Sequence, residues 1–179
     1  MQFQQVVRTF RDFFEAQQIR YAVVGGLAIH AWGRSRTTQD IDFLVDGLQQ
    51  PRVVAFVESL GYETLFVSEG FSNHLHASKD FGKVDVLYVY GRTADEMFAE
   101  AVQTLEVAGV QVPVPRAEHL VAMKVAAMKD APRRVLIDAP DVEYLMSLPG
   151  LDEAQIRNYF ERAGLLPLYD GIRRQQKRP

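Results

Sequence analysis

The sequence of 179 residues contains no cysteine. This absence excludes disulfide bonds, thiol catalysis and every metal site that needs a cysteine ligand, so any chemistry must use oxygen and nitrogen atoms. The chain also lacks an apolar run near the roughly 20 residues of a membrane-spanning helix, and its amphipathic start does not resemble a signal peptide. We therefore expect a cytoplasmic protein that has no membrane partner.

A large excess of one charge is also absent, since 20 basic and 23 acidic residues give a net charge of −3. This balance disfavours a dedicated nucleic-acid coat protein. The exception is the C-terminal segment 171–179, GIRRQQKRP, which is basic and holds no acidic residue. We expect a disordered, solvated tail there, and contact with RNA or an acidic partner is the functional alternative.

Strands and helices are expected to mix along the chain without strict alternation, which predicts an α+β fold with a mixed β-sheet flanked by helices. We divide the chain into an α/β core (1–115), a C-terminal helical portion packed on that core (116–170) and the tail (171–179). Apolar runs and turn residues predict strands at 21–24, 41–45, 62–67, 74–77 and 83–90, with two more around Gly109. Periodicity and capping patterns predict helices ending near 17, at 27–32, 51–60, from 93, and at 117–129, 141–148 and 152–163.

A glycine pair, Gly25-Gly26, lies between a predicted strand and a predicted helix. At such a turn the free backbone N–H groups attract an anion, and the missing side chains let a phosphate approach the main chain. The pair alone is weak evidence, because a tight turn with close packing has the same sequence.

Two carboxylates follow at the start of the next strand, Asp40 and Asp42. Residues two apart on a strand face the same way, so both carboxylates project to one place. A third, Asp85, interrupts the β-prone run KVDVLYVY. If its strand lies beside that of Asp40 and Asp42, the three carboxylates converge.

Convergent carboxylates repel each other, by on the order of 4 kcal/mol for two charges ~4 Å apart at an effective dielectric constant of about 20. Hard oxygen ligands of this kind suit Mg²⁺ or Mn²⁺, which also accept substrate phosphates as ligands. The three acids are the ligands expected for two-metal phosphoryl or nucleotidyl transfer. The alternative is a set of surface acids at strand ends.

Four cationic residues could accompany these acids. Lys124 falls on the apolar face of its predicted helix, where it either extends to solvent or meets an anion. Arg34 and Arg36 lie between the glycines and the carboxylates, within reach of a triphosphate, although loop arginines are often merely solvated. Lys83 shares a strand face with Asp85 and could be its charge partner.

Together, the glycine pair, the spacer GRSRTTQ, the DID motif and the later KVD resemble the DNA-polymerase-beta-like nucleotidyltransferase superfamily. Within it, the chain looks most like the AbiEii-type toxin nucleotidyltransferases and their stand-alone bacterial relatives. The motifs that carry this resemblance lie between residues 23 and 85. It implies a nucleotidyltransferase-like sheet, Mg²⁺ or Mn²⁺ as cofactor and an NTP such as ATP as substrate.

The resemblance also implies residue roles. Asp40, Asp42 and Asp85 would bind metal and be catalytic, with Asp85 helping to deprotonate the attacking hydroxyl. Gly25, Gly26 and Lys124 would bind nucleotide phosphates, and we add Arg34 and Arg36 to this set from their position. Asp138 and Asp141 resemble a DxxD-like segment that opens a C-terminal helix in the toxin branch, although Pro140 lies within it here.

The sequence thus predicts a metal-dependent nucleotidyltransferase that moves an NMP from an NTP to a hydroxyl or phosphate. The toxin-like resemblance implies a macromolecular acceptor, tRNA or protein, and an antitoxin partner. The spacing of GRSRTT and DID is also similar to that of aminoglycoside and lincosamide nucleotidyltransferases, which modify small molecules. Two further hypotheses are a nucleotide-binding regulator that transfers nothing, and a structural interaction protein.

Other conspicuous side chains are expected to be structural. His74 and His76 share a strand face, but without a third ligand we interpret them as a half-exposed pair and not a metal site. Trp32 is expected to pack behind the predicted helix at 27–32, with base stacking as its functional alternative.

Overall fold

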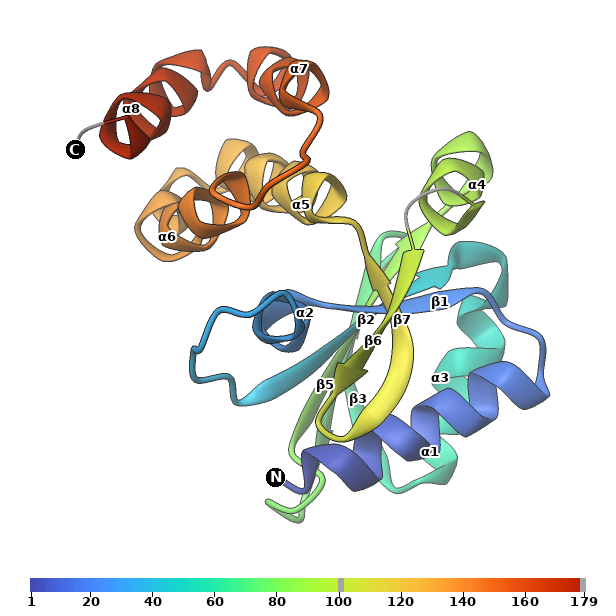
Figure 1. The fold of residues 1–179 in the computed structure, drawn as a ribbon. Helices are drawn as coiled ribbons and strands as arrows, with labels where there is room; N and C mark the ends of the chain where they lie inside the picture. The colour runs from blue at the N-terminus through green and yellow to red at the C-terminus, as the bar shows by residue number, and fades with distance from the viewer. Residues whose placement is uncertain (100–101, 178–179) are drawn as a thin grey trace. The chain divides into compact units, whose positions relative to one another are not determined.

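The computed structural model describes residues 1–99 and 102–177 of the chain (Figure 1). The chain forms two compact units, Met1–Pro115 and Arg116–Pro179. Within the described part of the chain, none of the helices combines the length and apolar character that crossing a bilayer requires.

The N-terminal unit is built on a five-stranded sheet in the order β1-β2-β5-β4-β3. Strands β2 and β5 are parallel, while the other neighbours are antiparallel, so the predicted mixed sheet is confirmed. The strands are β1 (Tyr21–Val24), β2 (Asp40–Asp46), β3 (Tyr62–Val67), β4 (Phe71–His76) and β5 (Lys83–Val89). The helices of this unit are α1 (Phe3–Ala16), α2 (Gly25–Ala31), α3 (Gln50–Ser59) and α4 (Gly91–Ala99), and the short 3₁₀ helix η1 spans Gly47–Gln49.

Aromatic side chains join α1 and α3 to one face of this sheet. The ring of Phe10 in α1 stacks on Phe43 of β2 with 4.9 Å between centroids, and it meets Phe56 of α3 edge-on. Phe13 stacks on the same Phe56 at 3.7 Å, so α1 and α3 lie side by side (Figure 1). Because α1 and α3 cover this face, the side chains of Asp40 and Asp42, on the other face of β2, lie away from these two helices.

A second sheet completes this unit. Strands β6 (Val102–Val107) and β7 (Val110–Pro115) pair antiparallel around the predicted turn at Gly109, whose φ of 76° is in the left-handed region. The indole of Trp32 donates from Nε1 to the carbonyl oxygen of Pro115 at 3.0 Å. This contact ties the residue after α2 to the end of β7.

The C-terminal unit is helical, as predicted. It contains α5 (Ala117–Asp130), α6 (Val135–Met146), α7 (Glu153–Ala163) and α8 (Leu166–Gln176), with a short 3₁₀ helix, η2 (Pro132–Arg134), before α6. Helix α7 begins where the Asp152 carboxylate accepts a hydrogen bond from the backbone N–H of Gln155 at 2.9 Å. It ends at Gly164, which adopts the left-handed conformation expected of a C-terminal cap.

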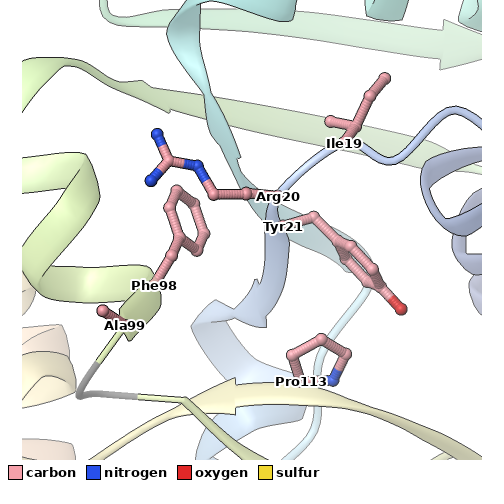
Figure 2. Close-up of a pocket in the computed structure, with 6 residues that line it drawn as sticks. All are labelled: Ile19, Arg20, Tyr21, Phe98, Ala99 and Pro113. Atoms are coloured by element: carbon pink, nitrogen blue, oxygen red, sulfur yellow. The ribbon is translucent and has the colours of Figure 1, made fainter.

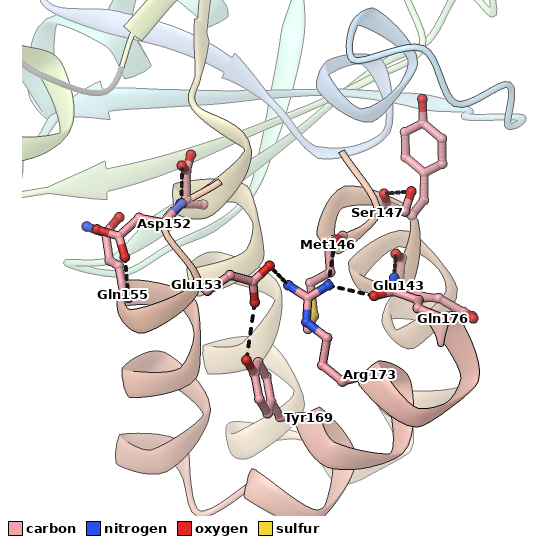
Figure 3. Close-up of polar contacts among 11 residues, drawn as sticks. Glu143, Met146, Ser147, Asp152, Glu153, Gln155, Tyr169, Arg173 and Gln176 are labelled. Carbon is pink, nitrogen blue, oxygen red and sulfur yellow. Dashed lines mark hydrogen bonds and ion pairs between the residues drawn. The ribbon is translucent and has the colours of Figure 1, made fainter. Parts of the chain in front are cut away.

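The prediction of a disordered tail over 171–179 was wrong for residues 171–176, which belong to α8. Arg173 holds this helix in place by donating to the carbonyl oxygen of Met146 at 2.7 Å and pairing with Glu153 (Figure 3). Ile172 beside it is buried. Arg173 therefore anchors the last helix, whereas residues 178–179 of the predicted tail lie outside the described part of the chain.

The helix predicted to begin at Asp141 begins at Val135 instead. Pro140, which precedes the predicted helix, lies inside α6. Proline removes one backbone hydrogen bond and strains an interior turn. Two aspartates near Pro140 in this helix, Asp138 and Asp141, make buried ion pairs.

Candidate functional site

Three carboxylates meet on the face of the sheet opposite α1 and α3. Asp42 of β2 pairs in register with Asp85 of β5, and Asp40 pairs with Lys83. Asp40, Asp42 and Asp85 each offer a carboxylate oxygen, and these oxygens lie within 4.8 Å of one another. All three residues are partly exposed. The predicted convergence is thus confirmed, and it follows from the parallel pairing of β2 with β5.

The glycine pair lies against these carboxylates. Gly25 is the first residue of α2 and has a φ of 63°, a conformation that side chains disfavour. A methyl group at Gly25 would lie 1.9 Å from Asp42 Oδ2, and one at Gly26 would lie 2.7 Å from Thr38 Oγ1. Glycine is therefore required at both positions because the Asp42 and Thr38 side chains approach so closely. This reason is more specific than the need for a tight turn.

Hydrogen bonds orient two of the three carboxylates. The Thr38 hydroxyl donates to Asp40 Oδ1 at 2.9 Å. Asn73 of β4 donates from Nδ2 to Asp85 Oδ1 at 2.8 Å. Sequence reasoning missed both residues: Thr38 has a local signal, two residues before the first aspartate, whereas Asn73 reaches Asp85 only because β4 pairs with β5.

The Lys83 ammonium pairs with one of these carboxylates. Its Nζ lies 2.6 Å from Asp85 Oδ2, so Lys83 is the charge partner that the sequence analysis considered. Partial burial lowers the pKa of Lys83, but the hydrogen bond with Asp85 and the charges of Asp85, Asp40 and Asp42 outweigh it and raise the pKa overall. The ammonium offsets part of the repulsion among the three acids.

The two spacer arginines lie on the segment between α2 and β2, and both are partly buried. The guanidinium carbon of Arg36 is 3.5 Å from the position that a methyl group on Gly26 would take. Arg36 thus lies beside the glycine pair. Arg34 is held at the end of α2, where its backbone N–H donates to the carbonyl oxygen of Ile29 at 3.2 Å.

Lys124 belongs to the C-terminal unit, where it meets two aspartates. Its Nζ is 2.7 Å from Asp138 Oδ1 and 2.8 Å from Asp141 Oδ2. Asp138 also pairs with Arg134. Burial raises the pKa of Asp138, but hydrogen bonds from Lys124 and Arg134 outweigh it, so this pKa is lowered overall. Lys124 was expected either to extend to solvent or to meet an anion. In the structure it meets anions, which are the carboxylates of Asp138 and Asp141.

The histidine pair is less exposed than predicted. His74 is fully buried, because its side of β4 faces the covered side of the sheet, and burial lowers its pKa. The hydroxyls of Ser72 and Thr64 lie 2.8 Å from Nε2 and 3.1 Å from Nδ1 of the ring. His76 is partly buried against Tyr62. The ring nitrogens of His74 are thus both occupied, as suits a structural residue.

A surface pocket of about 350 Å³ lies elsewhere in the N-terminal unit (Figure 2). Arg20 is its charged residue, and its guanidinium is paired with Asp46 at 2.5 Å and Asp95 at 2.7 Å. The pocket lining is Ile19, Arg20, Tyr21, Phe98, Ala99 and Pro113. None of the three converging carboxylates lines it, so it is separate from the cluster.

No protein-family model matches the chain, and no curated protein is significantly similar to it. Solved structures are similar to it over almost its full length. The antibiotic-resistance factor ANT(2'')-Ia has a TM-score of 0.66 at 18% identity, with 96% of this chain and 95% of that chain covered. These similarities decide the fold.

The chain has a nucleotidyltransferase fold.

Two further structures share this nucleotidyltransferase fold. The lincosamide antibiotic adenylyltransferase LnuA, solved with lincomycin, has a TM-score of 0.58 at 16% identity, covering 80% of this chain and 96% of that chain. A nucleotidyltransferase-like protein from Paracoccidioides brasiliensis has a TM-score of 0.57 at 15% identity, covering 94% and 91%. The expected nucleotidyltransferase-like α+β fold is therefore confirmed.

Proposed function

We propose that this chain is a metal-dependent nucleotidyltransferase that moves an NMP from an NTP to an acceptor hydroxyl and releases pyrophosphate. One observation carries the proposal: oxygens of Asp40, Asp42 and Asp85 lie within 4.8 Å of one another, against the glycine pair at the start of α2. The nucleotidyltransferase fold supports it.

The donor set fits the proposed cofactor. Three partly exposed carboxylates are hard oxygen ligands, which Mg²⁺ and Mn²⁺ prefer over soft ligands. Asp40, Asp42 and Asp85 would hold the cations, and Thr38 and Asn73 orient two of these carboxylates. Bound divalent cations neutralise charge on the phosphates and on the attacking and leaving oxygens.

The chain's own residues would position the reactants. Gly25 and Gly26 would bind the triphosphate through their backbone N–H groups, next to the Asp42 and Thr38 side chains that approach them and with the Arg36 guanidinium beside them. Arg34 follows on the same segment. Lys124 is the remaining candidate for phosphate binding, and in that role its ammonium would exchange Asp138 and Asp141 for phosphate oxygens.

The proposed reaction is a displacement at the α-phosphorus of the NTP. The acceptor hydroxyl oxygen forms a bond to this phosphorus, and the bond from phosphorus to the oxygen of the leaving pyrophosphate breaks. The proton of the hydroxyl passes to the Asp85 carboxylate. Lys83 and Asn73 donate to the two oxygens of Asp85, and each oxygen retains a further lone pair for this proton.

The acceptor that we propose to test first is a small hydroxyl-bearing molecule. Two similar structures belong to antibiotic-related proteins, one bound to lincomycin and another in complex with adenylyl-2''-tobramycin. The sequence resemblance to the toxin branch supports the other acceptor class, tRNA or protein, together with an antitoxin partner.

The experiment measures transfer of label from α-labelled ATP, GTP, CTP and UTP in Mg²⁺ or Mn²⁺, with lincomycin, tobramycin, tRNA and protein as acceptors. Transfer by the wild type should be lost in Asp42→Asn, while thermal stability is retained. Asp80→Asn, a change at an exposed aspartate, is the matched control and should behave as wild type.

The outcomes separate the hypotheses. Metal-dependent nucleotide binding without transfer to any acceptor would favour the regulatory alternative. Failure to bind Mn²⁺ or any nucleotide would contradict the proposal altogether. In a strain expressing the protein, raised antibiotic tolerance would indicate a small-molecule acceptor and growth arrest a macromolecular one.

A further inference from the structure

An apolar surface lies on the outer strands of the same sheet. We call it the apolar platform and define it by Leu65, Phe66, Phe71 and Leu75. These side chains are 42–52% exposed, which is unusual for large apolar residues. The rings of Phe66 and Phe71 stack with their centroids 5.0 Å apart. Large apolar side chains exposed together on paired strands mark a binding surface more often than single exposed residues do.

Strand register places this platform on the face that carries the three carboxylates. Asn73 of β4 pairs with Asp85, and its neighbours two residues away, Phe71 and Leu75, point to the same side. Phe66 of β3 pairs with Asn73 and therefore shares that side too. A register shift between Thr64 and Phe66 makes Leu65 the extra residue of a bulge, which adds its side chain to the exposed strand.

The separation suits one small molecule. Neighbouring strands lie about 4.8 Å apart, so β4 is about 5 Å and β3 about 10 Å from β5, which carries Asp85. A ring-bearing acceptor could place its hydroxyl at Asp85 and its body on Phe71 and Phe66. Asn73 lies between Asp85 and Phe66 in the strand register, and it donates to Asp85. It therefore marks the boundary between the carboxylates and the apolar platform.

The chemistry of the platform selects against a polycation. Glu63 is the one carboxylate in β3 and β4. An acceptor with many ammonium groups needs several carboxylates to replace the water that it loses. Asp40, Asp42 and Asp85 would be engaged by metal, so they cannot serve this purpose. Burial of apolar and aromatic groups against Phe66, Phe71 and Leu75 instead lowers the free energy of the complex.

We propose that the apolar platform is the acceptor subsite and that it binds the uncharged, apolar part of a small hydroxyl-bearing acceptor. This inference rests on the proposed function. The platform determines which acceptor is used, while the carboxylates perform the transfer. Lincomycin, whose sugar carries an alkylated proline amide, has the required chemistry, and tobramycin, a polyamine, does not.

The test is a calorimetric titration of the full chain with lincomycin and with tobramycin, with and without Mg²⁺ and a non-hydrolysable ATP analogue. The wild type should bind lincomycin at least ten-fold more tightly than tobramycin. The double variant Phe66→Thr/Phe71→Thr, which keeps residues suited to strands, should weaken lincomycin binding at least ten-fold without changing the affinity for Mn²⁺ or nucleotide. Phe66→Leu, which keeps the apolar area, should retain most of the binding and guards against a folding defect.

Leu48→Thr is the matched control, because Leu48 is 75% exposed on η1 and lies outside the platform; it should leave all affinities unchanged. The inference is overturned if a protein that binds Mg²⁺ and nucleotide does not bind lincomycin, binds tobramycin more tightly, or binds lincomycin equally in the double variant. It is also overturned if sedimentation shows a dimer that the double variant dissociates with lincomycin binding unchanged, since the platform is then an interface between copies. Failure of the proposed function would appear separately, because the wild type would then bind neither Mn²⁺ nor nucleotide.

Discussion

Asp42 Oδ2 lies only 1.9 Å from the point where a side chain on Gly25 would begin. The start of α2 and the carboxylate of β2 thus occupy adjoining space with no room for even one methyl group. The positive φ of Gly25 adds a second reason for glycine at this position.

We predict that Gly25→Ala lowers the free energy of unfolding by about 1–3 kcal/mol, because alanine is strained at this φ and displaces the Asp42 carboxylate. Mn²⁺ affinity should fall with it. Urea unfolding and Mn²⁺ titration measure the two effects. Gly70→Ala is the control, since a methyl group at Gly70 meets no atom within 4 Å and its φ is unstrained. Equal Mn²⁺ binding by Gly25→Ala and wild type would contradict the close approach.

Lys83→Met should bind Mn²⁺ more tightly than the wild type when nucleotide is absent. The ammonium of Lys83 competes with a cation for Asp85 Oδ2 and repels it. Because the Lys83 side chain is 41% exposed, solvent screening limits the gain to about five-fold, or ~1 kcal/mol. Electron paramagnetic resonance of free Mn²⁺ gives the affinity. The exposed neighbour Lys79 provides the control Lys79→Met, and weaker binding by Lys83→Met would refute the prediction.

Lys124→Met should destabilise the chain by about 3–5 kcal/mol, because it leaves the carboxylates of Asp138 and Asp141 buried and partly unpaired. Their side chains are 1% and 4% exposed. The loss should shrink on acidification, since protonation removes the unpaired charge in the folded variant. Chemical unfolding at several pH values tests this, with the exposed Lys129→Met as control. A loss below ~1 kcal/mol at neutral pH would show that the cluster contributes little.

Stability should fall as the pH drops below about 6.5, the ordinary pKa of histidine, because of His74. Burial lowers the pKa of His74 in the folded chain, so below this pH the unfolded chain binds more protons. By linkage, one such proton changes the free energy of unfolding by up to about 1.4 kcal/mol per pH unit. His74→Gln should lose this part of the slope, whereas the exposed His30→Gln should keep it. Identical slopes for wild type and His74→Gln would exclude His74 as the cause.

The sequence predicts those parts of the fold that local patterns determine. The bounds of β1 and β3 match the predicted runs, and the convergence of Asp40, Asp42 and Asp85 follows from strand periodicity once β2 and β5 are neighbours. That pairing is a tertiary property, which explains why the contact from Asn73 to Asp85 has no local signal.

The errors share a physical cause, which is that polar and proline residues were interpreted without their tertiary partners. Strand β4 begins at Phe71 and not at His74. The polar Ser72 can lie buried in this strand because its hydroxyl is hydrogen-bonded to His74 and Tyr88. The basic end of the chain is helical because Arg173 has partners within its unit. Pro167, in the first turn of α8, is a start signal that could have revealed this helix.

The parallel pairing of β2 with β5 has an evolutionary consequence. The proposed cation ligands lie on these two adjacent strands, whereas β3 and β4 belong to the part of the chain that connects them. Side chains on that part of the chain can therefore be exchanged without moving a ligand, provided that Asn73 is kept. A lineage could acquire new substrates by altering one hairpin and leave its chemistry intact.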